Sequence, residues 1–418
     1  MSQSDRNAEN EKASRADVAD VIIAGTGPSG LIAAILLARS GLDTVLVGPA
    51  APRDDRRTTA LLESSVRILD RIGLWPAIAR HAAPLKRMRI VDDTKRLFRA
   101  PETVFDSAEI GLDAFGYNIL NEDLNVILHD AAATTPSLRR VEGFVTGIVH
   151  HAHDCEVMVA GAGSLRARLL VGADGRNSRV REAAGIGVKR WNYDQAALVL
   201  NLRHDRPHHD TSTEFHTPSG PFTLVPLGDG RSSLVCVERP AEAERLTTLS
   251  PEALSLELER RAKSFLGKMR VDGPVQIYPL SGMTAEKVAA KRSALIGETA
   301  HVFPPIGAQG LNLSLRDIEA LGHVLERARA EHLDIGGEEV MARYERARRT
   351  DIATRTTAVD LLNRTLLADF LPIQMMRSVG LYLAGRIPPL RKLMMREGVA
   401  PGFISARGDD SLLGRLSR

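Results

Sequence analysis

Residues 20–49, DVIIAGTGPSGLIAAILLARSGLDTVLVGP, decide how this chain begins to fold. A β-rich run, DVIIA, leads into a turn with the pattern GxGxxG. An apolar helical stretch follows, ends at Gly41, and is succeeded by a second β-rich run, TVLV. Strand, glycine turn, helix and strand come in the order that a βαβ unit requires. The stretch therefore predicts the start of a parallel sheet.

The glycines of this turn predict a dinucleotide site. Gly25 allows the tight turn, Gly27 lets the backbone approach a pyrophosphate, and Gly30 lets the helix pack on the strand. Free N–H groups at the start of the helix favour anionic phosphates. The context favours dinucleotide binding over a purely structural turn, with these candidate binding residues: Gly25, Gly27, Pro28, Ser29 and Gly30.

One part of the expected site is missing. An acidic residue usually ends the second strand and holds a ribose hydroxyl, but here the position is Gly48. Asp54 and Asp55 follow a proline and come too late to replace it. The sequence therefore leaves the anchoring of the ribose open.

Two later stretches repeat the logic of a strand, a glycine turn and a helix. Residues 166–186, RARLLVGADGRNSRVREAAGI, place Asp174 and Gly175 after an apolar strand, where Asp174 suits either a cofactor ligand or a cap. Residues 294–317, ALIGETAHVFPPIGAQGLNLSLRD, place Glu298 after a short strand and Asn312 near the start of a helix. The cofactor site is therefore expected to be discontinuous in sequence.

The composition excludes several classes of function. The 418 residues are 44% hydrophobic and 26% charged, which is ordinary for a globular protein. A formal charge of +3 and 4% aromatic residues argue against nucleic acid as a partner. Cys155 and Cys236 have no metal-ligand spacing, and we interpret them as reduced thiols in the cytoplasm. The histidines of HDRPHHD (204–210) are interpreted as a solvated loop, so no metal site is predicted.

Together the three stretches resemble the three fingerprints of flavin-dependent aromatic hydroxylases with the p-hydroxybenzoate hydroxylase fold. The chain is most similar to the ubiquinone-biosynthesis flavin hydroxylases. Four further blocks carry that similarity: DRRTTALLESSVRILDRIGLW (55–75), WNYDQAALV (191–199), EFHTPSGPFTLVPLGDGRSSLV (214–235) and AHVFPPIGAQGLNLSLRDIEAL (300–321).

The resemblance implies an α/β fold with a Rossmann-like FAD-binding domain, an inserted and mostly antiparallel β-sheet substrate domain, and a C-terminal helical segment. We expect a disordered N-terminus at residues 1–17 and a discontinuous FAD-binding domain at 18–83, 117–188 and 279–338. The substrate domain is expected at 84–116 and 189–278, and the C-terminal helical region at 339–418.

The resemblance also implies chemistry. FAD is the cofactor and dioxygen the co-substrate, and a flavin C4a-hydroperoxide transfers oxygen to a phenol ring. NAD(P)H or a ferredoxin-type protein supplies the electrons. The third stretch begins Gly-Glu where the family usually has Gly-Asp. The implied cofactor-binding residues beyond the first turn are Arg57, Asp174, Gly175, Gly297, Glu298, Gly310, Leu311 and Asn312, and the implied catalytic residues are Pro305, Gly307 and His301. For His301 a structural role is favoured over a catalytic one.

By resemblance the substrate is a polyprenylated phenol in ubiquinone biosynthesis. Subunits of a quinone-biosynthesis complex and the cytoplasmic face of the inner membrane are the implied contacts of a cytoplasmic, peripheral protein. Two alternatives stay open. The first is a flavoenzyme of this fold that acts on a small soluble aromatic or reduces prenyl double bonds. The second is a flavin-binding or non-catalytic subunit of the complex.

Overall fold

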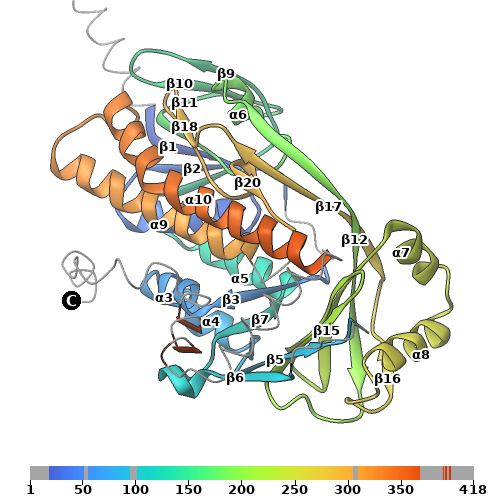
Figure 1. Ribbon diagram of the computed structural model, residues 1–418. Helices are drawn as coiled ribbons and strands as arrows, with labels where there is room; N and C mark the ends of the chain where they lie inside the picture. The colour runs from blue at the N-terminus through green and yellow to red at the C-terminus, as the bar shows by residue number, and fades with distance from the viewer. Residues whose placement is uncertain are drawn as a thin grey trace, which may run out of the picture.

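The computed structural model describes residues 18–50, 55–94, 101–304 and 309–367, together with 389, 391, 392, 395 and 396. These residues build an eight-stranded sheet, a nine-stranded sheet and a three-stranded sheet. Figure 1 shows the nine-stranded sheet extending from beside the eight-stranded sheet to the far end of the molecule, with the long helices α9 (Gln309–Ala330) and α10 (Glu338–Leu367) beside the eight-stranded sheet. The fold is therefore the mixed α/β arrangement that the sequence predicts.

The predicted βαβ unit is confirmed. It consists of β1 (Val18–Ala24), α2 (Pro28–Arg39) and β2 (Thr44–Gly48). β1 pairs in parallel with β2 on one side and with β11 (Gly163–Gly172) on the other. The strands form as predicted because their β-branched residues are buried on both sides of the sheet.

The order of the eight-stranded sheet brings distant segments together. The main path runs β18-β19-β11-β1-β2-β8, and β9 and β10 continue from β11 as an antiparallel meander. The remaining bounds are β8 (Leu138–Glu142), β9 (Val145–His150), β10 (Cys155–Val159), β18 (Ala289–Ala290) and β19 (Ser293–Leu295). Strands from three separate parts of the chain therefore lie next to one another.

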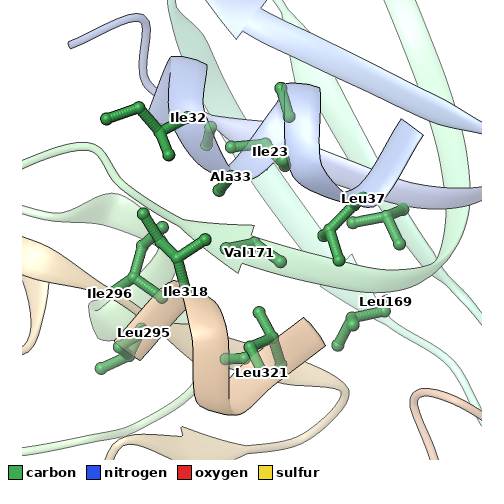
Figure 2. Packing of buried hydrophobic residues seen from close by; sticks show 14 of the residues in the cluster. Ile23, Ile32, Ala33, Leu37, Leu169, Val171, Leu295, Ile296, Ile318 and Leu321 are labelled. Carbon is green, nitrogen blue, oxygen red and sulfur yellow. The ribbon is translucent and has the colours of Figure 1, made fainter. Parts of the chain in front are cut away.

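The core of this part lies between the sheet and its helices. Figure 2 shows side chains of α2 and α9, among them Ile32, Leu37 and Leu321, gathered about the strand that carries Leu169 and Val171. All five side chains are buried. Because α2 contacts both α5 (Asn121–Ala133) and α9, the helices form one layer on the sheet.

The nine-stranded sheet follows the order β20-β17-β12-β15-β14-β13-β5-β6, and β16 pairs with β12. Its strands are antiparallel except for the pair β13 and β5. The bounds are β5 (Arg87–Asp92), β6 (Thr103–Asp106), β12 (Val188–His204), β13 (Thr211–Thr217), β14 (Gly220–Leu227), β15 (Arg231–Glu238), β16 (Met269–Val271), β17 (Gln276–Ala285) and β20 (His301–Val302). The predicted hairpin at 222–238 is confirmed as β14 and β15.

The two faces of this sheet have different environments. One face carries Leu198, Phe222 and Leu234 and is buried together with side chains of α7 (Pro240–Thr247) and α8 (Pro251–Arg261). The opposite face contacts the rest of the molecule, since the Ser233 hydroxyl accepts a hydrogen bond from Thr58 at 2.9 Å. We call this second face the inward face.

Short elements join the two large sheets. The three-stranded sheet has the order β3-β7-β4, with β3 (Thr58–Leu62), β4 (Ala83–Pro84) and β7 (Gly116–Leu120). The remaining helical elements are α3 (Glu63–Arg71), α4 (Trp75–Ala79), α6 (Arg179–Ala183) and the 3-10 helices η1 (Ser107–Ile110) and η2 (Gly297–Thr299). The predicted boundary at residue 278 lies inside β17, so the chain crosses between the predicted domains within one strand.

The C-terminal part returns to the nine-stranded sheet. Arg391 forms two hydrogen bonds of 2.6 Å with the Glu109 carboxylate and lies 4.5 Å from the centre of the Phe105 ring. Met395 is buried with Phe105 and Phe115. Among the described residues, none of the helices combines the length and the hydropathy needed to cross a bilayer.

A buried carboxylate connects the last two long helices to the third glycine turn. Asp317 on α9 accepts hydrogen bonds from the Gly297 N–H at 3.0 Å, from His301 Nε2 at 2.7 Å and from Arg348 Nε at 2.7 Å. Burial alone would raise the pKa of Asp317, but the nearby His301 and Arg348 lower it below its ordinary value. Asp317 is therefore ionised, and its charge is paired inside the core.

Replacing Asp317 with Asn should destabilise the protein strongly. The change removes the fully buried one of the two carboxylates that pair with Arg348, the other being Asp351, and breaking a buried ion pair costs about 3–5 kcal/mol. Because the native pKa of Asp317 is lowered, its contribution is present above an unfolded pKa of about 3.9 and is lost as the pH falls. Urea unfolding measures the loss at neutral pH.

The matched control is Glu319→Gln on the same helix. Glu319 pairs with Arg71 at the surface, so its loss should cost about 0–1 kcal/mol. Equal losses for Asp317→Asn and Glu319→Gln would contradict the central role of the buried carboxylate.

Candidate functional site

The three glycine turns meet at one edge of the eight-stranded sheet. Ala24, Gly172 and Leu295 are register partners at the carboxyl ends of β1, β11 and β19. The next residues of the chain are the beginnings of the three predicted motifs, at positions 25, 173 and 296. Crevices outside the carboxyl ends of parallel strands are where ligands bind in open α/β sheets. The edge is therefore the candidate cofactor site.

The first turn leaves no room for side chains at two of its glycines. Gly25 has φ of +120°, and a Cβ there would lie 2.2 Å from the Ala173 carbonyl oxygen. A Cβ on Gly30 would lie 1.9 Å from the Gly25 carbonyl oxygen. By contrast, a Cβ on Gly27 would meet nothing within 4 Å, so the backbone there is open to a ligand.

Thr26 fills the space beside Gly48. A Cβ on Gly48 would lie 2.7 Å from Thr26 Cγ2 and 2.8 Å from Thr26 Oγ1. The Thr26 hydroxyl donates a hydrogen bond of 2.7 Å to the Pro49 carbonyl oxygen. The side chain of Thr26 therefore occupies the space in which an acidic side chain at position 48 would begin.

The second and third turns are joined through hydroxyl and carboxylate groups. Asp174 Oδ2 accepts a hydrogen bond from the Arg179 N–H at 2.8 Å, and Asp174 Oδ1 accepts one from the Thr299 hydroxyl at 3.3 Å. Thr299 Oγ1 also accepts from the Gly175 N–H at 3.0 Å. Of the two roles that the sequence left open for Asp174, the structure shows the cap at the start of α6. Its predicted contact with cofactor stays a prediction.

The third turn also touches the first. Gly297 has φ of +60°, and a Cβ there would lie 3.0 Å from the Ser29 hydroxyl. Glu298 is exposed and forms an ion pair of 3.2 Å with Arg176, which belongs to the second stretch. Residues predicted from three separate stretches are thus neighbours in space.

Arg57 lies against the nine-stranded sheet, next to Tyr278 on β17. Its guanidinium forms hydrogen bonds of 2.7 Å and 2.6 Å with the Asp55 carboxylate and lies 5.4 Å from the centre of the Tyr278 ring. Burial alone would raise the pKa of Asp55, but hydrogen bonds from Arg57 and Asn121 lower it below its ordinary value. Arg57 is therefore held by a carboxylate at the border between the two sheets.

The side chain of Asn312 is used for packing. Its Oδ1 accepts from the Leu62 N–H at 2.8 Å and the Ser65 hydroxyl at 2.6 Å, and its Nδ2 donates to the Ala60 carbonyl oxygen at 2.7 Å. These bonds fix the start of α9 against β3 and α3. A contact of position 312 with an anionic ligand would therefore come from the backbone, together with Gly310 and Leu311 in the same turn.

His301 faces the core. It is 2% exposed, its ring lies 5.4 Å from that of Phe303, and Nε2 is bonded to Asp317. This geometry favours the structural alternative for His301 over a catalytic role. The other two predicted catalytic residues, Pro305 and Gly307, lie outside the described residues.

The two cysteines and the histidine-rich segment do not form a site. Both thiols are buried, and burial raises the pKa of Cys155 and of Cys236 to about 12. His204 and His208, predicted to be solvated, instead bond through Nε2 to the Ser232 hydroxyl and the Leu227 carbonyl oxygen. These hydrogen bonds hold the two rings against neighbouring strands. The polar composition of the segment gave no sign of them.

Comparison with known proteins agrees with this arrangement. The family model described as FAD binding domain matches residues 18–359. Ubiquinone hydroxylase UbiL of Rhodospirillum rubrum is 34% identical over 91% of this chain and 90% of that protein. The 3-demethoxyubiquinol 3-hydroxylase of Escherichia coli is 30% identical over 90% of this chain and 97% of that protein.

Solved structures share the fold. The p-nitrophenol 4-monooxygenase PnpA of Pseudomonas putida superimposes with a TM-score of 0.75 at 22% identity, covering 91% of this chain and 97% of that one. PqsL of P. aeruginosa gives a TM-score of 0.72 at 23% identity, covering 87% of this chain and 99% of that one.

Together with the three converging turns, the family match and these relatives place the chain in the class of FAD-dependent aromatic hydroxylases. Within that class, the chain belongs to the FAD-binding monooxygenase family that includes the ubiquinone hydroxylases. The resemblance seen in the sequence is thereby confirmed.

The residues fit FAD at the phosphate end better than at the ribose end. The open backbone at Gly27 and the start of α2, which has no side-chain cap, suit a pyrophosphate. A side chain at position 48 would have to displace Thr26, because its Cβ would lie 2.7 Å from Thr26 Cγ2. FAD can therefore bind through the glycine turn, but this chain lacks the usual carboxylate for the adenosine ribose.

Sequence reasoning missed three residues of this region. The roles of Thr26 and Tyr278 follow only from their contacts in the structure, with Gly48 and with Arg57 respectively. Asp317 was quoted in the third stretch, but its spacing gave no sign that it binds the Gly297 N–H. The available signal for Asp317 was only its place between the apolar residues Leu315 and Ile318 of a predicted helix.

Restoring the acidic residue should require two changes. Gly48→Glu alone should not strengthen FAD binding, because the new side chain collides with Thr26. Thr26→Gly together with Gly48→Glu should strengthen it about tenfold, since a hydrogen bond to a charged group contributes about 1.5–3 kcal/mol. Quenching of flavin fluorescence during titration measures the dissociation constant.

Thr26→Gly alone is the matched control for this double variant. It removes the obstructing side chain without adding a carboxylate, so its affinity for FAD should stay near that of the unchanged protein. Tight binding by Gly48→Glu alone would contradict the steric argument.

Proposed function

We propose that this protein hydroxylates the aromatic ring of a polyprenylated phenol in ubiquinone biosynthesis, using FAD and dioxygen. The observation that carries the proposal is the convergence of the three turns at one sheet edge. Two relatives over nine-tenths of the chain, a ubiquinone hydroxylase and a 3-demethoxyubiquinol 3-hydroxylase, support it. NAD(P)H or a ferredoxin-type protein is the proposed electron donor.

Each part of the proposed site would contact a different part of FAD or the substrate. The Gly25–Gly30 turn and the start of α2 hold the pyrophosphate, and Asp174, Gly175, Gly297 and Glu298 line the ribityl side. Backbone N–H groups near Leu311 and Asn312 stabilise negative charge at the flavin edge. When bound and reduced, FAD would supply the chemistry that activates dioxygen, and dioxygen would be the source of the oxygen atom added to the ring. Pro305 and Gly307 are proposed to line the reaction face, where few side chains obstruct the substrate.

The inward face of the nine-stranded sheet is the proposed cover of the substrate ring. Arg57 and Tyr278 lie where this sheet borders the cofactor edge. By composition, residues 377–418 suit a polyprenyl tail or a membrane surface, since they contain eight Lys or Arg and three Asp or Glu. That excess of five positive charges suits an anionic membrane surface, although Arg391 is already paired with Glu109.

One observation supports a second candidate. The absence of a carboxylate at position 48 removes an expected FAD contact, which favours a flavin-binding or non-catalytic subunit of a quinone-biosynthesis complex. The other rivals from the sequence are hydroxylation of a small soluble aromatic and reduction of prenyl double bonds.

The proposed reaction is tested by oxygen uptake and product analysis. The purified protein should show flavin absorption, consume dioxygen when FAD is reduced, and add one oxygen atom to 2-farnesylphenol but not to phenol lacking the tail. Mass spectrometry identifies the product. A protein that takes up no FAD would support the non-catalytic alternative instead.

Gly307→Val should abolish most hydroxylation, because its branched side chain would crowd the proposed reaction face. FAD binding should change less than product formation, and both are measured on the same preparation. Gly228→Val is the control, since a Cβ on Gly228 meets nothing within 4 Å and the residue lies in a hairpin turn. Full turnover by Gly307→Val would show that the face lies elsewhere.

A further inference from the structure

A row of five residues crosses the inward face of the nine-stranded sheet. Register partners connect Gln276, Val199, Val235, Thr223 and Glu214 on five successive strands, β17, β12, β15, β14 and β13. Four strand spacings of about 4.8 Å give the row a length of roughly 19 Å. One end lies beside Tyr278, whose hydroxyl donates to Gln276 Oε1 at 3.0 Å, and hence beside Arg57.

All five residues of this row are half-buried, whereas their neighbours on the opposite face are buried under α8. Solvent therefore reaches the row, although it faces the rest of the molecule. Its middle is apolar, with Val199 and Val235, and its far end is polar. An aromatic ring that packs on the two valines would direct a hydroxyl group toward Thr223 and Glu214.

A histidine and a carboxylate are paired at the polar end. His216 Nε2 lies 2.8 Å from Glu214 Oε1, and the Thr223 hydroxyl donates to Glu214 Oε2 at 3.1 Å. Burial alone would raise the pKa of Glu214, but the hydrogen bonds from His216 and Thr223 lower it below its ordinary value. The carboxylate is therefore ionised and can only accept hydrogen bonds.

The other ring nitrogen of His216 has no partner among the described residues. The side chain is 9% exposed, and Nδ1 is fully buried without a hydrogen bond. An ionised Glu214 requires the proton of the neutral imidazole to sit on Nε2, so Nδ1 carries a free lone pair. A buried acceptor without a partner is costly in a folded protein, and a bound hydroxyl group would satisfy it.

We propose that His216 accepts the hydroxyl proton of the phenol and that Glu214 positions its imidazole for this step. The inference rests on the proposed function and names the base of that reaction. The phenol O–H bond breaks, the Nδ1–H bond forms, and the electron pair stays on oxygen. The phenolate ring is more nucleophilic than the phenol, and the imidazolium lies between two negative charges, the phenolate and Glu214.

Few other charges stand beside this pair in the described part of the chain. Asp92 on β5 is the register partner of His216 and accepts hydrogen bonds from Thr94. On the opposite face, Lys263 pairs with Asp93 at 2.8 Å. At the polar end of the row, the His216–Glu214 pair is thus the proton acceptor, whereas the carboxylate near the opposite end, Asp55, is already bonded to Arg57.

The test is a single turnover by the full-length protein with bound FAD. The flavin is reduced with one equivalent of dithionite and then mixed with oxygenated buffer and 2-farnesylphenol. His216→Gln should reduce the rate of hydroxylation about 100-fold at neutral pH, the lower range for loss of a general base. The loss should shrink as the pH rises to about 9, because a phenol with a pKa of about 10 then ionises in solution.

Two further variants accompany the measurement. His209→Asn is the matched control, because His209 is exposed in the turn before β13 with φ of +50°, which Asn tolerates. It should retain the unchanged rate. Glu214→Gln should lose less activity than His216→Gln, and it tests the pair independently if His216→Gln fails to fold or to bind FAD.

The outcomes separate this inference from the proposed function. Hydroxylation by His216→Gln within twofold of the unchanged protein at neutral pH would overturn the assignment of the base and leave the function intact. An equal loss at every pH would show a structural role only, which also overturns it. If the unchanged protein and His209→Asn bind FAD but hydroxylate no phenol, the proposed function itself fails.

Discussion

The ion pair network around Asp317 is the interaction on which the rest of the structure depends. One carboxylate with no exposure to solvent holds the Gly297 backbone, the His301 ring and the Arg348 guanidinium at once. These partners belong to the third turn, to β20 and to α10. The same buried charge therefore holds the left-handed Gly297 and connects the two long helices α9 and α10. Because Gly297 belongs to the third turn, these contacts also help to position the cofactor edge.

The two large sheets meet the site in different ways. The parallel strands contribute only their ends, because their faces are buried by helices and by the meander. The antiparallel sheet contributes a face, since its alternating side chains leave one side against α8 and the other side half-buried. A flat ligand at the strand ends and a ring on the sheet face are thus compatible within one chain.

Two pairs of residues in this chain depend on each other, Gly48 with Thr26 and Glu214 with His216. The loss of an acidic residue at position 48 accompanies a threonine at position 26 that occupies its volume. Glu214 and His216 lie two residues apart on β13, so both point to the inward face and can bond each other. Each member of such a pair is understandable only when its partner is known.

The sequence by itself determined the βαβ unit, the three motifs and the hairpin of β14 and β15, because glycine spacing and apolar periodicity are local properties. The tertiary structure alone decided which strands are neighbours, and hence that Ala24, Gly172 and Leu295 end at one edge. It also decided that His301 faces Asp317, that Asn312 packs on β3, and that His216 Nδ1 has no hydrogen-bond partner within the described ranges. Such contacts join residues far apart in the chain, or depend on burial that no local pattern encodes.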